Sequence, residues 1–334
     1  MGTQDMESKM WKSLKKMDQK RKPHYVLAFA AVMAVSSAQL VQAAFFDTAG
    51  KSARAMGMGE VFLASAGDVS SYWYNPAGLV KFEKRQVGLS YGIPVAVVSG
   101  LNISQVNFAT PLGKRSGLGI GISYGGIDVA SDMVISGGYA LSLTDKFTLG
   151  GNAKIMRWSV EGQATRDGTS KDDTISKTSF SLDLSATYAL GELFGLGTFT
   201  TGVYVKDAIM PNISESGNEG GKLPVERGIG IMMQKDLVAV ECDIAACDVA
   251  HVNNIIYHAG FEYEVSGTDL KLRGGYIRGS NRTIIFKKGD VAKEDINLGL
   301  GYGFRSVIFN YAYNFPLVAT NTNGRHFISF GISF

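Results

Sequence analysis

Cysteine, proline and long apolar runs are scarce in this sequence. Its only two cysteines, Cys242 and Cys247, stand at an odd spacing that places them on opposite faces of a strand, which argues against a local disulfide. Seven prolines and a charged fraction of 19% exclude a proline-rich or disordered chain. After residue 44, no segment approaches the ~18 consecutive apolar residues that indicate a membrane-spanning helix.

Most of the chain also lacks an excess of charge of one sign. The net charge is +3, but residues 1–44 hold seven Lys and Arg against three Asp and Glu, which leaves 26 basic and 27 acidic residues in the rest. A balanced chain lacks the basic surface with which a protein binds nucleic acid. Nucleic acid is therefore excluded as a partner.

Residues 1–44 have the three parts of a secretory signal peptide: a basic start, an apolar run over 25–35 and small residues at 41–44. A membrane anchor is the alternative, but the run is shorter than the ~20 residues that span a bilayer as a helix. We expect a signal peptide that is cleaved on export, with translation starting at Met1, Met10 or Met17.

Glycine is abundant, with 41 residues, and from Gln86 onward apolar side chains fall on alternate positions in segments of about ten residues. The pattern predicts an all-β domain over 86–334. Its strands are expected at 86–94, 101–110, 117–125, 132–143, 147–159, 178–190, 198–206, 225–233, 237–247, 254–265, 268–278, 294–304, 307–315 and 324–334.

Alternation alone does not separate a membrane barrel from a soluble sandwich, since both have a wet and a dry face. The connections separate them. Short turns follow even-numbered predicted strands, whereas the long polar connections 160–177, 207–224 and 279–293 follow odd-numbered ones. This parity predicts an up-and-down antiparallel transmembrane β-barrel of 14 strands in the outer membrane, with its outer face against lipid.

Ionisable residues share the face that is opposite the apolar one, where a sandwich core would not tolerate them but a wet lumen does. We expect a lumen charge network in which Glu241 and Asp243 pair with Lys271 and Arg273 across the strand at 254–265. The predicted members of this network are Glu241, Asp243, Glu262, Lys271 and Arg273.

Residues 45–85 precede the barrel and are rich in glycine and other small residues, without a sustained apolar period. We expect them to form an N-terminal hatch, a plug inside the lumen. Glycines at alternate inward positions, such as 117, 119 and 121 or 299, 301 and 303, would leave room for it. Within the hatch, Asn75, Pro76, Ala77 and Gly78 form a rigid corner, which is either a gate or a static turn.

The chain ends in alternating apolar residues. Phe330, Ile332 and Phe334 resemble the terminal signal that the outer-membrane assembly machinery recognises, so this machinery and outer-membrane lipid are expected partners. We expect neither a cofactor nor a metal, because none of the four histidines stands at ligand spacing with another. Without a nucleophile elbow or a clustered base, the sequence does not predict an enzyme.

Two motifs near the start, ARAMGMG at 53–59 and YWYNPAGL at 72–79, resemble the N-terminal signature shared by PorV/PorQ-type outer-membrane proteins and FadL fatty-acid transporters. GFEY at 260–263, LRGGY at 272–276, NYAY at 310–313 and HFISFGISF at 326–334 resemble the C-terminal half of PorV/PorQ-type proteins. The resemblance implies a 14-stranded barrel with an N-terminal hatch that holds the Asn-Pro-Ala turn.

Two functions follow from the hatch and the resemblance. The first is passive transport of a small hydrophobic or amphipathic ligand across the outer membrane, with the corner at Asn75 as gate. The alternative is a PorV-like scaffold that binds exported proteins or secretion-system components through its external loops. Loops 161–177 and 207–224 contain no aromatic residue. This departure from the fatty-acid transporters weakens the case for a fatty acid as ligand.

Overall fold

The computed structural model of the chain describes residues 51–65, 68–93, 102–127, 130–160, 175–213, 222–249, 252–280, 292–318 and 324–334. The predicted signal peptide and residues 45–50 of the predicted hatch lie outside these residues. The same holds for 161–174, 214–221 and 281–291, which make up most of the three long connections.

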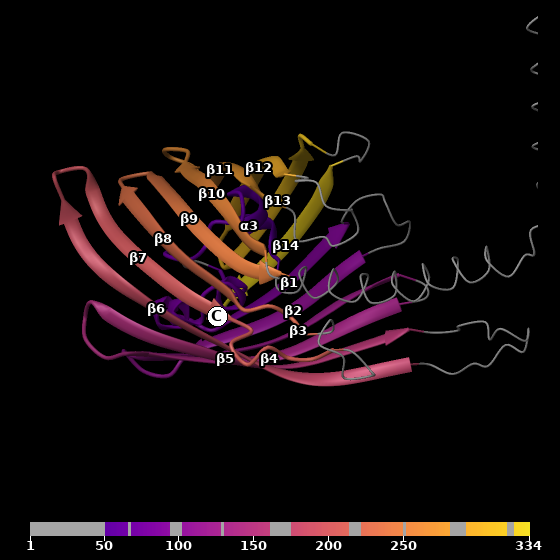
Figure 1. Cartoon of the computed structure of the whole chain (residues 1–334). Helices are drawn as coiled ribbons and strands as arrows, with labels where there is room; N and C mark the ends of the chain where they lie inside the picture. The colour runs from indigo at the N-terminus through magenta and orange to yellow at the C-terminus, as the bar shows by residue number, and fades with distance from the viewer. Residues whose placement is uncertain are drawn as a thin grey trace, which may run out of the picture. The chain divides into compact units, whose positions relative to one another are not determined.

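Fourteen strands follow one another along the described chain, and Figure 1 shows them in sequence order. They are β1 (Gln86–Ile93), β2 (Asn102–Pro111), β3 (Ser116–Ile127), β4 (Ala130–Ser142), β5 (Phe147–Val160), β6 (Ile175–Leu193), β7 (Gly197–Lys206), β8 (Glu226–Lys235), β9 (Val238–Val249), β10 (Val252–Glu264), β11 (Leu270–Ser280), β12 (Ala292–Phe304), β13 (Val307–Pro316) and β14 (Arg325–Ser333).

The strands form a closed antiparallel barrel. Each strand pairs with its neighbours in sequence, and β14 pairs with β1 from Gln86↔Ser333 to Ile93↔His326. Closure leaves no strand edge with unpaired backbone groups, which a barrel in lipid requires. The predicted count, order and up-and-down topology are confirmed.

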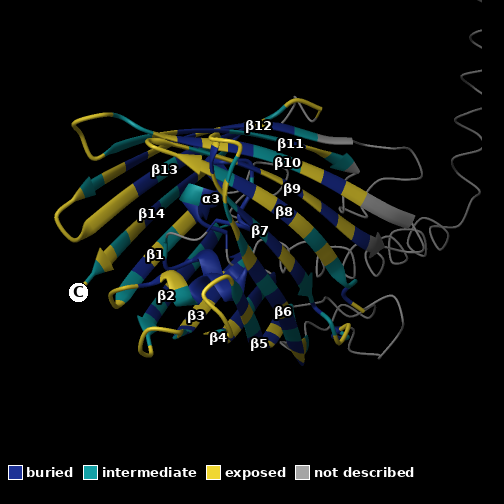
Figure 2. Cartoon of the chain, turned by 90° about the vertical axis from the view of Figure 1, so that its left-hand side faces the viewer, coloured by how far each residue is buried: buried dark blue, intermediate teal, exposed yellow. Residues whose placement is uncertain are grey.

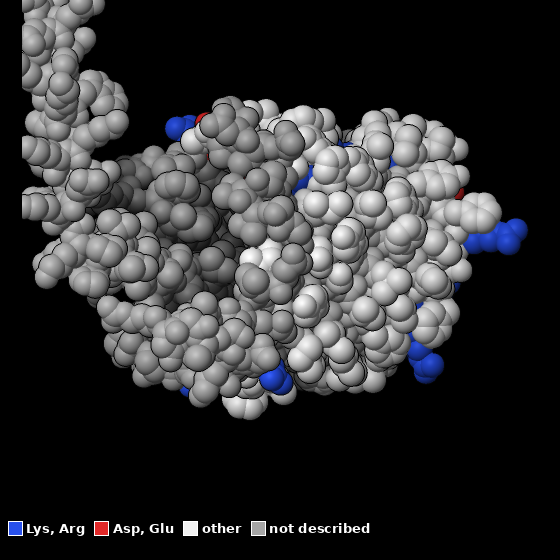
Figure 3. All heavy atoms as spheres, turned by 90° about the vertical axis from the view of Figure 1, so that its right-hand side faces the viewer, with Lys and Arg blue, Asp and Glu red and all other residues white. Residues whose placement is uncertain are grey.

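The outer face of the barrel is apolar, whereas the inner face is mostly polar or glycine, with one apolar cluster that includes Val134, Met156 and Trp158. In β12, Ile296, Leu298 and Leu300 are exposed, whereas Asn297, between the first two, is fully buried. Exposed and buried residues alternate along most of the strands in Figure 2, and the described surface in Figure 3 carries few Lys, Arg, Asp or Glu. Such a wall matches lipid outside and a filled lumen inside.

The described residues before β1, which we call the N-terminal segment (51–65 and 68–85), lie inside the ring of strands (Figure 2). The segment contains α3 (Ala53–Gly57), η1 (Ser71–Trp73) and η2 (Pro76–Lys81). Helix α3 contacts β11 to β14, and η2 contacts β2 to β6. The segment thus reaches across the lumen. Its assignment as a movable hatch stays a prediction.

Inward glycines let the wall approach the segment. A Cβ on Gly202 would overlap the carbonyl oxygen of Leu63, and one on Gly260 would overlap that of Met58. The same holds for the predicted positions 117, 119, 121 and 299, which face residues of the segment. Gly301 instead makes room for the side chain of Arg273.

Local features agree with the sequence analysis or extend it. Cys242 is exposed and Cys247 is buried, and neither forms a disulfide. Strand β6 runs to Leu193, beyond its predicted end at 190, because a bulge between Ala189 and Gly191 allows pairing to continue. Among the described helices, none is long and apolar enough to cross a membrane.

Candidate functional site

Two buried carboxylates of β9 hold the N-terminal segment by its backbone. Asp243 Oδ2 accepts the N–H groups of Phe62 at 2.9 Å and Leu63 at 3.3 Å. Glu241 Oε1 accepts those of Ala64 at 2.6 Å and Ser65 at 3.3 Å. Four consecutive donors meet carboxyl oxygens in a site away from water, where hydrogen bonds are strong. We call Glu241 and Asp243 the carboxylate cradle.

The local sequence explains why β9 presents both carboxylates inward. Residues 241 and 243 are two apart and share a face, while Cys242 and Ile244 are exposed on the outer face. Gly230 of the neighbouring β8 has no side chain, and a Cβ there would collide with Asp243. The wall therefore leaves space for the cradle.

A second anchor joins the segment to β10 and β11. Glu262 binds Arg54 of α3 (Nε to Oε2 3.1 Å) and Arg273 of β11 (Nε to Oε2 2.6 Å). Arg273 also donates to Asn310 of β13 at 2.9 Å, and Asn310 donates to Ser329 of β14. One chain of polar contacts thus runs from the segment across the wall to β14.

The predicted pairing of Glu241 and Asp243 with Lys271 and Arg273 is wrong. Arg273 pairs with Glu262, its direct partner in the β10–β11 register. Lys271 pairs with Glu264 at 3.1 Å, and both side chains are more than a third exposed. Gly260 stands opposite Glu241 and His258 opposite Asp243 in the β9–β10 register, and the cradle binds the N–H groups of the segment.

The predicted corner at residues 75–78 is a capped 3₁₀ helix. Asn75 Oδ1 accepts the N–H of Ala77 at 3.0 Å, and Pro76 occupies the first helical position, where its missing N–H costs nothing. Asn75 Nδ2 donates to the carbonyl of Leu63, which lies between the two pairs of donors held by the cradle. The Ala77 N–H also donates to Ser185 of β6, and Gly78 is buried.

We expect Asn75→Ala to loosen this corner without unfolding the barrel. The change removes the cap of η2 and leaves the buried Leu63 carbonyl without its amide donor, a loss of about 2 kcal/mol. Limited proteolysis of the purified protein should cut the segment faster, while the barrel band stays intact. Asn75→Asp keeps the cap oxygen and is expected to fall between wild type and Asn75→Ala. Equal protection of all three proteins would contradict the role of Asn75.

Charges on the segment complement the wall. Burial alone would lower the pKa of Arg54, but attraction to Glu262 raises it above its ordinary value, so Arg54 stays charged. Burial lowers the pKa of Lys81, an effect that attraction to Glu241 partly offsets. Lys81 Nζ donates to the carbonyl of Ala64 at 3.2 Å, beside the cradle.

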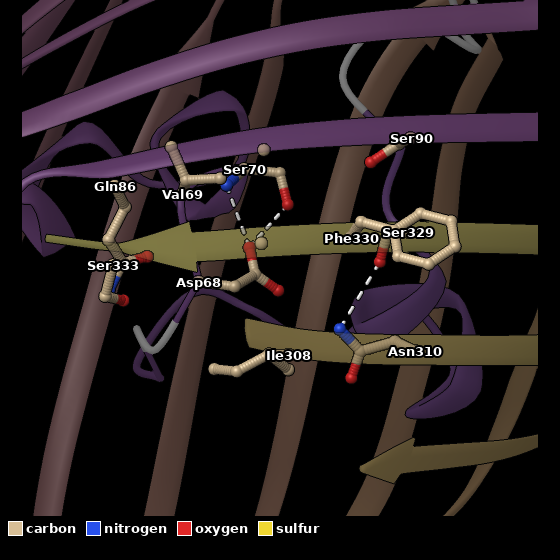
Figure 4. Close-up of a pocket in the computed structure, with 12 residues that line it drawn as sticks. Asp68, Val69, Ser70, Gln86, Ser90, Ile308, Asn310, Ser329, Phe330 and Ser333 are labelled. Carbon is tan, nitrogen blue, oxygen red and sulfur yellow. Dashed lines mark hydrogen bonds between the residues drawn. The ribbon is translucent and has the colours of Figure 1, made fainter. Parts of the chain in front are cut away.

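A narrow pocket lies between the segment and the strands that close the barrel (Figure 4). Asp68 Oδ1 accepts the Ser70 N–H and hydroxyl from within the segment. Facing it are small or polar side chains of β1, β13 and β14, including Ser90, Asn310 and Ser329. The wall at the β1–β14 seam is thus less tightly filled than at the cradle.

Residues 69–332 match the family described as type IX secretion system membrane protein PorP/SprF. The match covers the segment from Val69 onward and nearly the whole barrel. The chain belongs to the PorP/SprF family. The expected kinship with secretion-associated outer-membrane proteins therefore holds, but the narrower assignment to the PorV/PorQ type is not confirmed. No curated protein matches this PorP/SprF chain in sequence.

Solved structures share the barrel of this PorP/SprF chain. The CymD monoaromatic hydrocarbon channel is 14% identical with a TM-score of 0.65, covering 84% of this chain and 96% of its own. The P. putida toluene transporter TodX is 15% identical with a TM-score of 0.65, covering 85% and 99%. The Ralstonia pickettii toluene transporter TbuX is 15% identical with a TM-score of 0.62, covering 86% and 100%. Identities this low show the fold alone, that of an outer-membrane barrel.

Other predicted sites of the PorP/SprF chain lie as follows. Phe330 and Ile332 are exposed on the outer wall, and Phe334, just past β14, donates its N–H to the Arg85 carbonyl. Their role as an assembly signal stays a prediction. His258 Nδ1 lies 2.8 Å from the Gly59 carbonyl. Within the described ranges, no group of His, Cys, Asp and Glu has the arrangement of a metal site.

Sequence reasoning missed the partners that the segment supplies. Arg54 and the backbone donors at 62–65 lie far from β9 and β10 in the chain, so no local pattern reveals their contacts. One signal was present: Glu241, Asp243 and Glu262 place three carboxylates on two neighbouring strands, against only two basic residues, Lys271 and Arg273, on the same expected face of the next strand. That imbalance indicates that donors come from elsewhere in the chain.

Proposed function

We propose that this chain is a closed outer-membrane scaffold of a type IX secretion apparatus, which binds secretion components or exported proteins through its external loops. The family match supports a place in secretion. The observation that carries the scaffold role is the cradle, because its carboxyl oxygens hold the N-terminal segment inside the lumen at residues 62–65. A scaffold needs a rigid barrel rather than an open path.

The long connection after β5 supplies the binding surface in this proposal. It is polar, contains no aromatic residue and follows an odd-numbered strand, as the external loops of such a barrel do. Polar loops on a rigid barrel suit protein partners, since a scaffold positions its loops for recognition.

Replacement of residues 161–174 by the dipeptide Asn-Gly tests the scaffold role. A two-residue turn can join β5 to β6, whose ends Val160 and Ile175 are direct partners in the register, so the barrel should assemble in the outer membrane at the wild-type level. We expect the tagged variant to lose the secretion components that co-purify with the full chain, and the secretion of exported proteins to fall. Matched deletion of residues 319–323, a short connection, serves as control. Unchanged co-purification after the change at 161–174, or an equal loss after deletion of 319–323, would argue against the loop after β5 as the contact.

Passive transport of a small hydrophobic molecule is the second candidate. An apolar cluster inside the barrel favours it, since Tyr72 and Trp73 of the segment contact Val134, Met156 and Trp158 of the wall. Displacement of the corner at residues 75–78 would open the path. Uptake of radiolabelled toluene into liposomes that contain the protein should then exceed that of empty liposomes and rise further with Asn75→Ala. Equal uptake in all three would eliminate transport.

A further inference from the structure

The described residues of the connection after β7, 207–213 and 222–224, lie against the inner wall of the barrel. Asp207, the first residue after β7, adopts a positive φ of 54°, and Met210 one of 47°. Non-glycine residues rarely adopt this conformation unless surrounding contacts hold it. Such contacts are present at the start, the middle and the end of the described part of this connection.

The start of the connection is fixed by a buried ion pair. Lys154 of β5 lies 2.7 Å from Asp207 Oδ1 and 2.8 Å from Asp183 Oδ1 of β6. Ser181 donates to Asp207 at 2.7 Å, and the Asp207 N–H donates to Asp183 at 2.9 Å. Loss of one partner of such a pair leaves a buried charge unpaired, so the contact fixes the geometry. We call Lys154, Asp183 and Asp207 the latch.

The middle of the connection is bonded to two inward side chains of the wall. Trp158 of β5 donates to the carbonyl of Ile213, and Ser179 of β6 donates to that of Asn212. Both partners on the wall are buried. The connection is closed on itself by a bridge between Asn212 and Lys222 and by the Leu223 N–H, which donates to Pro211 at 2.9 Å.

Two apolar side chains of the connection pack against the inner wall. Ile213 and Leu223 are buried, with 2% and 6% of their surface exposed, in one cluster with Val134, Met156 and Trp158 of the wall. In contrast, the neighbouring Ile209 and Met210 are about half exposed. The buried pair thus packs into the lumen, and the same cluster continues to Trp73 of the N-terminal segment.

We propose that residues 207–213 and 222–224 form an outer plug, a second closure of the lumen that is separate from the N-terminal segment. Ile213 and Leu223 cover an apolar patch of the inner wall formed by Val134, Met156 and Trp158. The latch orients the plug at its start. An incoming molecule from the loop end reaches this patch only when the plug leaves, whatever the barrel binds or transports.

Cysteine accessibility tests the outer plug. Met156→Cys is placed in a chain that carries Cys242→Ala and Cys247→Ala, and the purified folded protein is labelled with a small maleimide in detergent. The double variant Ile213→Asp with Leu223→Asp should displace the plug, because the plug could stay in place only if it buried two charged carboxylates. We expect the labelling rate at position 156 to rise about tenfold or more, since the rate follows the open fraction.

The matched control is Ile209→Asp with Met210→Asp, the same change at exposed positions of the same connection, which should leave the rate unchanged. A second reporter, Ala140→Cys, lies in the part of the apolar cluster near the N-terminal segment. It should label slowly both with the native plug and with the Ile213→Asp and Leu223→Asp variant. Asp207→Ala breaks only the latch, so it is expected to raise the labelling rate at position 156 by less than the double variant does. It provides the test if the double variant does not fold. Fast labelling at position 156 with the native plug, or no rise in the folded variants, would overturn the proposal.

Discussion

Gly202→Ala is expected to lower the free energy of unfolding of the barrel by about 3 kcal/mol. The added methyl group would clash with backbone atoms, which cannot move aside as a flexible side chain can. The added Cβ would overlap the carbonyl of Leu63, a residue whose N–H is bound by the cradle and whose carbonyl is bound by Asn75. Alanine is otherwise no worse than glycine in a strand, so the loss reports the contact with the segment. Denaturant unfolding in lipid vesicles measures it.

Gly331→Ala is the matched control. Gly331 lines the pocket at the β1–β14 seam, and a Cβ there would meet no atom within 4 Å. The change should be neutral or stabilise the barrel by up to ~1 kcal/mol, since it reduces the freedom of the unfolded chain. Changes of opposite sign in the free energy of unfolding at Gly202 and Gly331 would show that the segment contacts the wall at Gly202. Similar values at both positions would contradict the close approach at Leu63.

The double variant Glu241→Ala with Asp243→Ala is expected to release the N-terminal segment from the wall. It leaves four backbone N–H groups at residues 62–65 without their acceptors. Each buried donor that loses its partner costs about 1–3 kcal/mol of unfolding free energy, which gives a total of about 4 kcal/mol or more. Hydrogen bonds to water that enters the site would reduce this loss. Limited proteolysis within 51–85 and denaturant unfolding should both detect the change.

Two comparisons make the cradle prediction specific. Glu241→Gln keeps an acceptor oxygen and loses only the charge, so it should cost less than half of the effect of the double variant. Glu264→Ala removes a carboxylate from an exposed pair with Lys271. Solvent screens such a pair, so its loss should change the free energy of unfolding very little. If Glu264→Ala were as damaging as the double variant, loss of charge in general and not the cradle would explain the result.

The strands could be predicted from sequence because their signal is local. Alternation in β12 and β14 depends on residues two positions apart, and the turn residues between strands depend on their immediate neighbours. The parity of connection lengths then distinguished a barrel from a sandwich. Fourteen strands of this kind allow closure, and the register from Gln86↔Ser333 onward completes it.

The partners of the buried charges could not be predicted in the same way. The sequence places Glu241, Asp243, Glu262 and Arg273 on the inner face, as the structure has them. It does not reveal that Arg54 reaches Glu262 across 208 positions of the chain, or that Asp243 binds the N–H of Phe62 across 181. Such pairs depend on where the segment enters the lumen.

By itself, the sequence determined a 14-stranded barrel with an apolar outside, an ionisable inside and room made by glycines. These properties follow from the two-residue period of a strand, which assigns each side chain to a face without knowledge of the rest. Only the tertiary structure decided which acceptors meet which donors, and that the connection after β7 folds inward onto Trp158. Buried polar groups bond to whatever lies within reach, and reach inside a closed barrel is set by the whole ring of strands.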